Sequence, residues 1–133
     1  MISRSLALRL RDAGLEWAPQ PHDVFAIPDR DLDDRLFVVA DLSTEITEIA
    51  GLRTITFNGV VEWSLDWILS EDVVWMPSEA QLREQVGGNL VALERRADGY
   101  RCIVEIGRQL RQFDATDAAD AYAGALLALI ERI

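Results

Sequence analysis

Three aspartates at alternate positions are the residues best placed to bind a metal ion. Asp29, Asp31 and Asp33 lie in the stretch PDRDLDDR. Alternating carboxylates of this kind open calcium-binding loops, where they converge on one hard cation. The rest of that pattern fails, because its sixth position is Asp34 rather than glycine and its twelfth is Ala40 rather than glutamate. A solvated hairpin loop is the favoured interpretation, and a weak metal site the alternative.

The only histidine, His22, precedes Asp23 in a loop bounded by prolines. A His–Asp contact can orient a general base, so His22 joins the three aspartates in a second hypothesis, a small metal-dependent hydrolase. One histidine excludes a multi-histidine zinc site, and no G-x-S-x-G nucleophile elbow is present. We therefore favour a surface-loop histidine over a catalytic one.

The only cysteine, Cys102, alternates with Tyr100, Val104 and Ile106 in a pattern typical of one face of a strand. A thiol in apolar surroundings has a raised pKa and is inert, so we interpret Cys102 as a small core residue. A reactive thiol would need a positive neighbour, and the adjacent Arg101 points to the other face. A single cysteine also excludes an internal disulfide framework.

Four tryptophans are many for a chain of 133 residues: Trp17, Trp63, Trp67 and Trp75. Filling the core of a small sheet is the simpler interpretation of Trp63 and Trp67. In the alternative, both rings line a concave sheet face with Glu62 or Asp66 at its rim and bind a ligand or peptide. The residues predicted to contact a partner are Glu62, Trp63, Trp67 and Trp75.

The charge of the chain excludes several activities. Its formal net charge is −10, with 23 acidic residues against 13 basic ones, and every basic residue is arginine. Without lysine there is no Walker-type phosphate loop and no Schiff-base chemistry. The acidity disfavours nucleic-acid binding and favours either a basic partner or simple solubility. The sequence points to no cofactor.

No feature of the sequence indicates a membrane or a secretory route. The longest apolar run, residues 121–130, is shorter than the roughly 20 residues that a membrane span needs. The N-terminal stretch contains arginines but no continuous apolar region of a signal peptide. Together with the single cysteine, this predicts a cytoplasmic protein without membrane insertion.

The first part of the chain is predicted to contain a helix and several strands, which must position these residues. Periodicity predicts an amphipathic helix over residues 3–14, ending at Gly14. β-favouring residues predict strands over 24–27 and 35–41, and over 45–57 with a turn at Gly51.

A hairpin is predicted at Asn58-Gly59, a dipeptide suited to a two-residue turn. Residues 61–67 then alternate apolar and polar, which predicts a strand. A helix would also bring Trp63 and Trp67 together, but the unbroken alternation favours the strand.

The middle of the chain predicts a short strand followed by a capped helix. Residues 73–75 form an extended segment. Ser78 suits the N-cap position, and Gln81, three residues later, completes a capping box. The helix is expected to end at Gly87.

The last third predicts a three-strand meander over residues 89–96, 100–106 and 109–113. Tight turns are expected at Asp98-Gly99 and at Gly107-Arg108.

A closing helix is predicted from residue 114 onward, capped by Asp114 or Thr116. Small residues would let this helix lie close to a sheet: Ala121, Gly124, Ala125 and Ala128. The alternative is a self-association seam through Ala121, Gly124 and Ala128, which would make the protein a structural homodimeric scaffold. The whole order of elements predicts an α+β fold, with an antiparallel sheet of two meanders and N-terminal, middle and C-terminal helices. We expect one domain over residues 1–133.

Three stretches of the last three-quarters of the chain are similar to a group of short bacterial proteins of uncharacterised function. They are an Asn-Gly-x-x-Glu-Trp hairpin, a Trp-x-Pro-x-x-x-Gln-Leu-Arg helix start and an Ala-Asp-Ala-Tyr-Ala helix. The residues concerned are Asn58, Gly59, Glu62, Trp63, Trp75, Pro77, Gln81, Leu82, Arg83 and those from Ala119 to Ala123. Some members have a pilus-assembly label of the CpaE type. Well-understood proteins of that name resemble ATPases with a lysine-containing phosphate loop, so the resemblance implies an accessory role here and brings no catalytic residues.

These observations lead to one leading hypothesis about function. We expect a non-enzymatic accessory domain that binds a protein or peptide partner, in the setting of pilus or secretion-system assembly. The metal-dependent hydrolase and the homodimeric scaffold are the two rivals.

Overall fold

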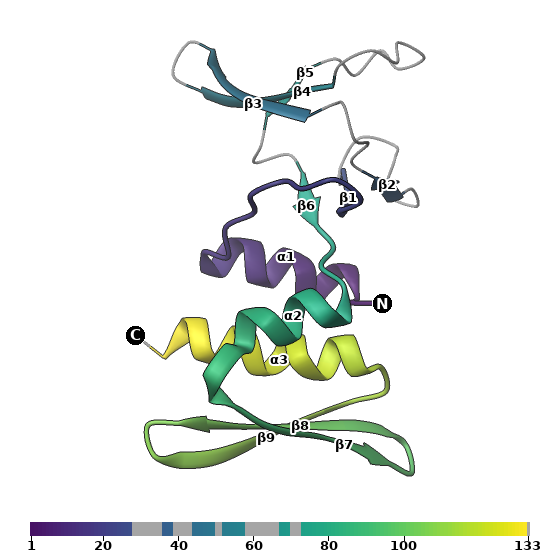
Figure 1. Ribbon diagram of the computed structural model, residues 1–133, viewed down its shortest axis with the longest axis vertical. Helices are drawn as coiled ribbons and strands as arrows, with labels where there is room; N and C mark the ends of the chain where they lie inside the picture. The colour runs from purple at the N-terminus through teal and green to yellow at the C-terminus, as the bar shows by residue number, and fades with distance from the viewer. Residues whose placement is uncertain (28–35, 39–43, 50–51, 58–66, 70–72, 133) are drawn as a thin grey trace. The chain divides into compact units, whose positions relative to one another are not determined.

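A computed structural model describes residues 1–27, 36–38, 44–49, 52–57, 67–69 and 73–132 of the chain (Figure 1). Over these ranges it has three α-helices and three antiparallel sheets of three strands each, which confirms the α+β fold with antiparallel sheets. The sequence led us to expect one domain, and the structure divides into two compact units. Unit 1 consists of residues 1–16 and 76–133, and unit 2 of residues 17–75.

Unit 1 is built in layers around one helix. Its elements are α1 (Arg4–Ala13), α2 (Glu79–Val86), a 3-10 turn (Gly87–Asn89), β7 (Leu90–Arg96), β8 (Gly99–Ile106), β9 (Gln109–Ala115) and α3 (Ala118–Glu131). Helix α3 contacts β8 and β9 on one side and α1 and α2 on the other (Figure 1). A helix with neighbours on opposite sides must be apolar almost all round, and α3 is rich in alanine and leucine for this reason.

The first two helices begin as the sequence predicts. Ser3 caps α1, its Oγ accepting a hydrogen bond from the Leu6 amide, and Gly14 ends the helix in the left-handed conformation with φ 109°. Ser78 Oγ accepts a hydrogen bond from the Gln81 amide at 3.1 Å, and the Ser78 amide donates to Gln81 Oε1 at 2.9 Å. The predicted capping box of α2 is therefore confirmed.

The predicted cap of the closing helix is wrong. Asp117, rather than Asp114 or Thr116, is the N-cap of α3, and its Oδ1 accepts from the Ala119 amide at 2.8 Å. Strand β9 continues to Ala115, so Asp114 lies within the strand and cannot cap the helix. The Asp114 carboxylate is instead paired with Arg101 on the neighbouring strand, which removes it from the helix start.

The start of α3 is also joined to the N-terminal segment. The Met1 ammonium lies 2.8 Å from Asp117 Oδ2, and the Ser3 amide donates to Asp120 Oδ1 at 2.6 Å. Two acidic side chains in the first turn of α3 therefore fix the residues just before α1. This contact brings together the first and the last helix of the chain.

The two tight turns of the meander have different outcomes. Gly107 and Arg108 have φ values of 59° and 68°, as a two-residue turn with both central φ positive requires. The other turn is Ala97-Asp98, so the predicted pair Asp98-Gly99 is wrong by one residue. Gly99 instead opens β8 opposite Arg96 with φ 146°. An added Cβ there would lie 2.7 Å from Thr116 Cα and against the Ala115 carbonyl, so this position requires glycine.

The small residues of α3 serve packing inside the chain. Ala121 is buried, and a Cβ built on Gly124 would lie 3.6 Å from Phe113 Cδ1 on β9. The helix can approach the sheet closely because these positions lack bulky side chains. The predicted homodimer through Ala121, Gly124 and Ala128 stays a prediction, and two of these three residues already contact or are covered by their own chain.

Unit 2 contains the two other sheets. One has the order β2-β1-β6, from β2 (Leu36–Val38), β1 (Val24–Ala26) and β6 (Val74–Trp75); the other has the order β3-β4-β5, from β3 (Thr44–Ile49), β4 (Leu52–Phe57) and β5 (Trp67–Leu69). The predicted Asn58-Gly59 turn lies outside the described residues, as does most of the predicted strand over 61–67.

Candidate functional site

Sheet β2-β1-β6 brings aromatic residues into one row. Phe25 lies opposite Phe37 on one side and opposite Trp75 on the other, and directly opposed residues of antiparallel strands share a face. The Phe25 and Phe37 rings stack with centroids 5.5 Å apart, and the Trp17 ring lies 5.5 Å from Phe25 at a tilt of 39°. We call Trp17, Phe25, Phe37 and Trp75 the aromatic row.

The two tryptophans of the row differ in their hydrogen bonds. Trp17 Nε1 donates to Asp23 Oδ2 at 2.9 Å. Trp75 Nε1 is buried and has no hydrogen-bond partner in the part of the chain that the structure describes. A buried donor without an acceptor costs roughly 1–3 kcal/mol, so each such group in a folded protein requires an explanation.

Asp23 is the buried carboxylate beside the row. It is 5% exposed, and its Oδ2 accepts hydrogen bonds from Trp17 Nε1 and, at 3.0 Å, from the Gln20 amide. These contacts give Asp23 the task of closing the loop between α1 and β1. Its neighbour His22 is exposed and adopts a left-handed conformation with φ 73°, in the loop where a surface histidine was expected.

Strand β2 presents apolar side chains on both of its faces. Phe37 belongs to the aromatic row, while Leu36 and Val38, which alternate with it, are 42% and 59% exposed. Strand β2 lies at the edge of its sheet. An edge strand often has charged or polar residues, so exposed leucine and valine are notable at this position.

The residues predicted to contact a partner are described only in part. Trp75 lies on β6 in the aromatic row, and the backbone of Trp67 opens β5 opposite Thr56. Glu62 and Trp63 lie outside the described residues, as do the side chain of Trp67 and the predicted metal ligands Asp29, Asp31 and Asp33. Among the residues described, no three His, Cys, Asp or Glu side chains come together in a way that could hold a metal ion.

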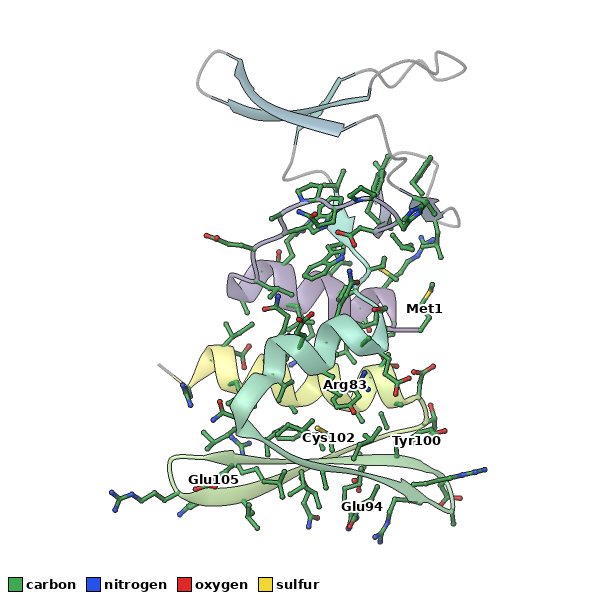
Figure 2. The ribbon with its side chains drawn as sticks, viewed as in Figure 1. Met1, Arg83, Glu94, Tyr100, Cys102 and Glu105 are labelled. Carbon is green, nitrogen blue, oxygen red and sulfur yellow. The ribbon has the colours of Figure 1, made fainter. Side chains whose placement is uncertain are left out.

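Cys102 is a core residue, as the alternation on β8 indicates. It is fully buried on the helix side of the sheet, and Figure 2 shows it there while Glu94 points to the opposite side. Burial raises the pKa of the Cys102 thiol to about 11, so the thiolate is scarce at neutral pH.

Arg101 is engaged on the outer face of the same sheet. Its Nε and Nη2 lie 2.7 and 3.0 Å from the two carboxylate oxygens of Asp114. This hydrogen bonding lowers the pKa of Asp114 and raises that of Arg101. The guanidinium therefore pairs with a carboxylate across the sheet and is directed away from the thiol.

Most of the aromatic row was not predicted from the sequence. Trp75 was predicted to contact a partner, whereas Trp17, Phe25 and Phe37 had no predicted role. The available signal was local: Trp17 and Gln20 lie six and three residues before Asp23, which is spaced to accept hydrogen bonds from both. The pairing of β1 with β6 joins segments that are far apart in the sequence, and no pattern in the sequence predicts this pairing.

Comparison of the chain with protein-family models, with curated proteins and with solved structures gives no match. The resemblance to short bacterial proteins with a pilus-assembly label therefore stays a prediction. None of the helices over the described ranges combines the length and the apolar character that crossing a bilayer requires.

Proposed function

We propose that this protein is a non-enzymatic accessory domain that binds an extended segment of a protein or peptide at the aromatic row of unit 2. The observation that carries the proposal is the buried Trp75 indole N–H, which has no acceptor among the described residues. Because this N–H is buried, a backbone carbonyl of a bound segment supplies that acceptor when binding displaces the groups that cover the indole. Binding would then recover the free energy that the unsatisfied donor costs in the free protein.

The surroundings of Trp75 suit this kind of ligand. Phe25 is 1% exposed and supports the row from the core, while Trp17, Phe37 and Trp75 are partly exposed. Partly exposed aromatic rings give contact area with little conformational freedom to lose, and they are enriched where proteins recognise one another. The exposed Leu36 and Val38 add apolar surface on the edge strand of the same sheet. An extended segment can pair with such an edge through its main chain and place alternate side chains on the apolar surface.

The charge of the chain narrows the class of partner. A formal net charge of −10 attracts basic segments and repels acidic ones at low salt. An accessory role in pilus or secretion-system assembly, which the sequence resemblance implies, is a setting in which one protein binds segments of another. We include that setting in the proposal.

The test uses a display library of random linear peptides, followed by calorimetry of the selected peptides against variants. Trp75→Phe removes the N–H and keeps an aromatic ring, so it should weaken binding by about tenfold. Trp17→Phe is the matched control, because its N–H already donates to Asp23. Selected peptides that bind Trp75→Phe as tightly as the parent chain would refute the proposed site.

The rival function, a metal-dependent hydrolase using Asp29, Asp31, Asp33 and His22, has a separate test. Calorimetry with Ca²⁺, Mg²⁺, Mn²⁺ and Zn²⁺ measures whether the chain binds a divalent ion. Heat that disappears in the triple variant Asp29→Asn, Asp31→Asn, Asp33→Asn would favour the hydrolase. Heats that match dilution into buffer would end that hypothesis.

A further inference from the structure

Strand β9 of unit 1 has an open edge. It pairs with β8 over seven residue pairs, from Tyr100–Ala115 to Ile106–Gln109, without a register shift. On its other side no strand pairs with it in the residues that the structure describes. The opposite edge of the same sheet differs, because β7 has an irregularity at Val91. Bulges protect sheet edges from pairing with other chains, so β9 is the unprotected edge.

The backbone groups that β9 directs outward follow from the turn before it. The two-residue turn Gly107-Arg108 is closed by the pair Ile106–Gln109, and such a closing pair exchanges both of its hydrogen bonds. Hydrogen-bonded pairs alternate along an antiparallel ladder. The odd-numbered residues from Gln109 to Ala115 therefore bond to β8, while Leu110, Gln112 and Asp114 direct their N–H and C=O groups away from it.

The edge strand packs against a helix and has no net charge. Helix α3 packs under β9, and Gly124 of that helix lies against Phe113. The strand carries one positive and one negative side chain. Arg111 lies over the Phe113 ring at 5.3 Å, and Asp114 is paired with Arg101. In a chain of net charge −10, self-repulsion is least where the local charge cancels.

We propose that a second copy of this chain pairs with β9, antiparallel, about a two-fold axis through Gln112. The two meanders would then form one six-stranded sheet. In this register Gln112 lies opposite its counterpart, and Leu110 lies opposite Asp114 of the other copy. All three outward-directed residues of each strand are then hydrogen-bonded.

The charges and the length of β9 favour this register over the two registers shifted by one residue. Centring the axis on Gln112 places Arg111 opposite Phe113 of the second copy, where the guanidinium again meets an aromatic ring. Centring it on Arg111 would place two guanidinium groups directly opposite each other, which is destabilising. Centring it on Phe113 would pair Leu110 with a residue beyond the end of the strand.

Sedimentation equilibrium of the full chain tests the proposal through opposite charges at position 112. We expect the parent chain to reach twice the monomer mass as concentration rises. Gln112→Lys and Gln112→Glu should each weaken self-association by about tenfold or more, because like charges then meet on the axis. An equimolar mixture of the two variants should associate again. Val91→Lys on the other edge, at an exposed position, should associate as the parent does.

Two results would overturn the proposal: a parent chain that stays monomeric at sub-millimolar concentration, or association that Gln112→Lys leaves unchanged. Circular dichroism of each variant checks that the fold is kept. Gln112→Pro gives an independent measure, because it removes an N–H that points away from β8 and so leaves the ladder intact. Gln112→Pro should remain folded and monomeric.

Discussion

Units 1 and 2 differ in how their polar groups find partners. In unit 1 the helix starts are satisfied by side chains close in sequence: Ser3 for α1, Ser78 with Gln81 for α2, and Asp117 for α3. In unit 2 the described part leaves the Trp75 indole N–H without an acceptor and exposes Leu36 and Val38 on an edge strand. Unit 1 therefore satisfies its helix starts within the chain and leaves one strand edge, β9, open among the described residues. Unit 2 instead leaves a buried donor and exposed apolar side chains that a binding partner would complete.

The difference between the two units leads us to expect the largest loss of stability from a substitution in the three-strand meander of unit 1. Gly99→Ala would place a Cβ against the Ala115 carbonyl at a φ of 146°, which side chains rarely adopt. We expect a loss of about 3 kcal/mol or more in the free energy of unfolding, measured by urea denaturation. Gly88→Ala is the control: no atom lies within 4 Å of its added Cβ and its φ is not positive, so the change should stay within about 0.5 kcal/mol. Equal losses in both variants would contradict a cost set by the close approach of β9, since the lower entropy of the unfolded chain favours alanine at both positions.

The same substitution, Trp→Phe, should lower stability more at Trp17 than at Trp75. Trp17→Phe leaves the buried Asp23 carboxylate without one of its donors and should cost about 1–3 kcal/mol. Trp75→Phe removes a donor that has no described acceptor, so it should cost less than about 1 kcal/mol or stabilise the chain. Urea denaturation of both variants measures the difference. A larger loss for Trp75→Phe would mean that its N–H is satisfied within the chain.

The local features of unit 1 could be predicted from the sequence better than the aromatic row of unit 2. The capping box at Ser78 and Gln81 and the turn at Gly107-Arg108 depend on residues within a few positions of one another, and both were predicted. The cap of α3 was misplaced because Asp114, Thr116 and Asp117 all suit an N-cap by type. The pairing of Asp114 with Arg101 and the length of β9 exclude Asp114, and the bond from the Ala119 amide to Asp117 identifies the cap.

The candidate site could not be predicted to the same extent. Its row depends on β1 pairing with both β2 and β6, and the register of Phe25 with Trp75 joins segments far apart in the sequence. Apolar strands of three or fewer residues show too little periodicity to predict which strand they pair with. Trp75 was predicted as a contact residue from its type alone, and its buried N–H is a property of the fold.

Acid should weaken unit 1 through Asp117. Its hydrogen bond to the N-terminal ammonium, with a further one from the Ala119 amide, lowers the pKa of this carboxyl below its ordinary value of 3.8. A lowered folded-state pKa adds stability above the unfolded value, and this stability is lost as pH falls through the folded value. Urea midpoints measured from pH 7 to about pH 3 should therefore fall less for Asp117→Asn than for the parent chain. Parallel curves would contradict a role for this carboxylate.

Loss of the capping box should lower the free energy of unfolding by about as much as the loss of an ordinary helix cap does. Ser78→Ala removes the Oγ that accepts from the Gln81 amide, and we expect a loss of about 1 kcal/mol in urea denaturation. Gln85→Ala is the control, since Gln85 lies inside α2 itself on an exposed surface and caps no helix. Because α2 belongs to unit 1, Ser78→Ala should leave peptide binding at the aromatic row unchanged, which separates stability from binding.

The smallest expected effect is a gain in stability at the turn before β9. Arg108 has a φ of 68°, a left-handed conformation that costs free energy for any residue with a branched or long side chain. Arg108→Gly adopts that conformation without a steric penalty, at the cost of more entropy in the unfolded chain, so we expect a net gain of about 0.5 kcal/mol in the free energy of unfolding. His22 has a similar φ of 73° in unit 2, and His22→Gly tests whether the same relief occurs there. A gain at Arg108 with a loss at His22 would show that the His22 side chain holds its loop through contacts of its own, which would make that loop part of the architecture of the aromatic row.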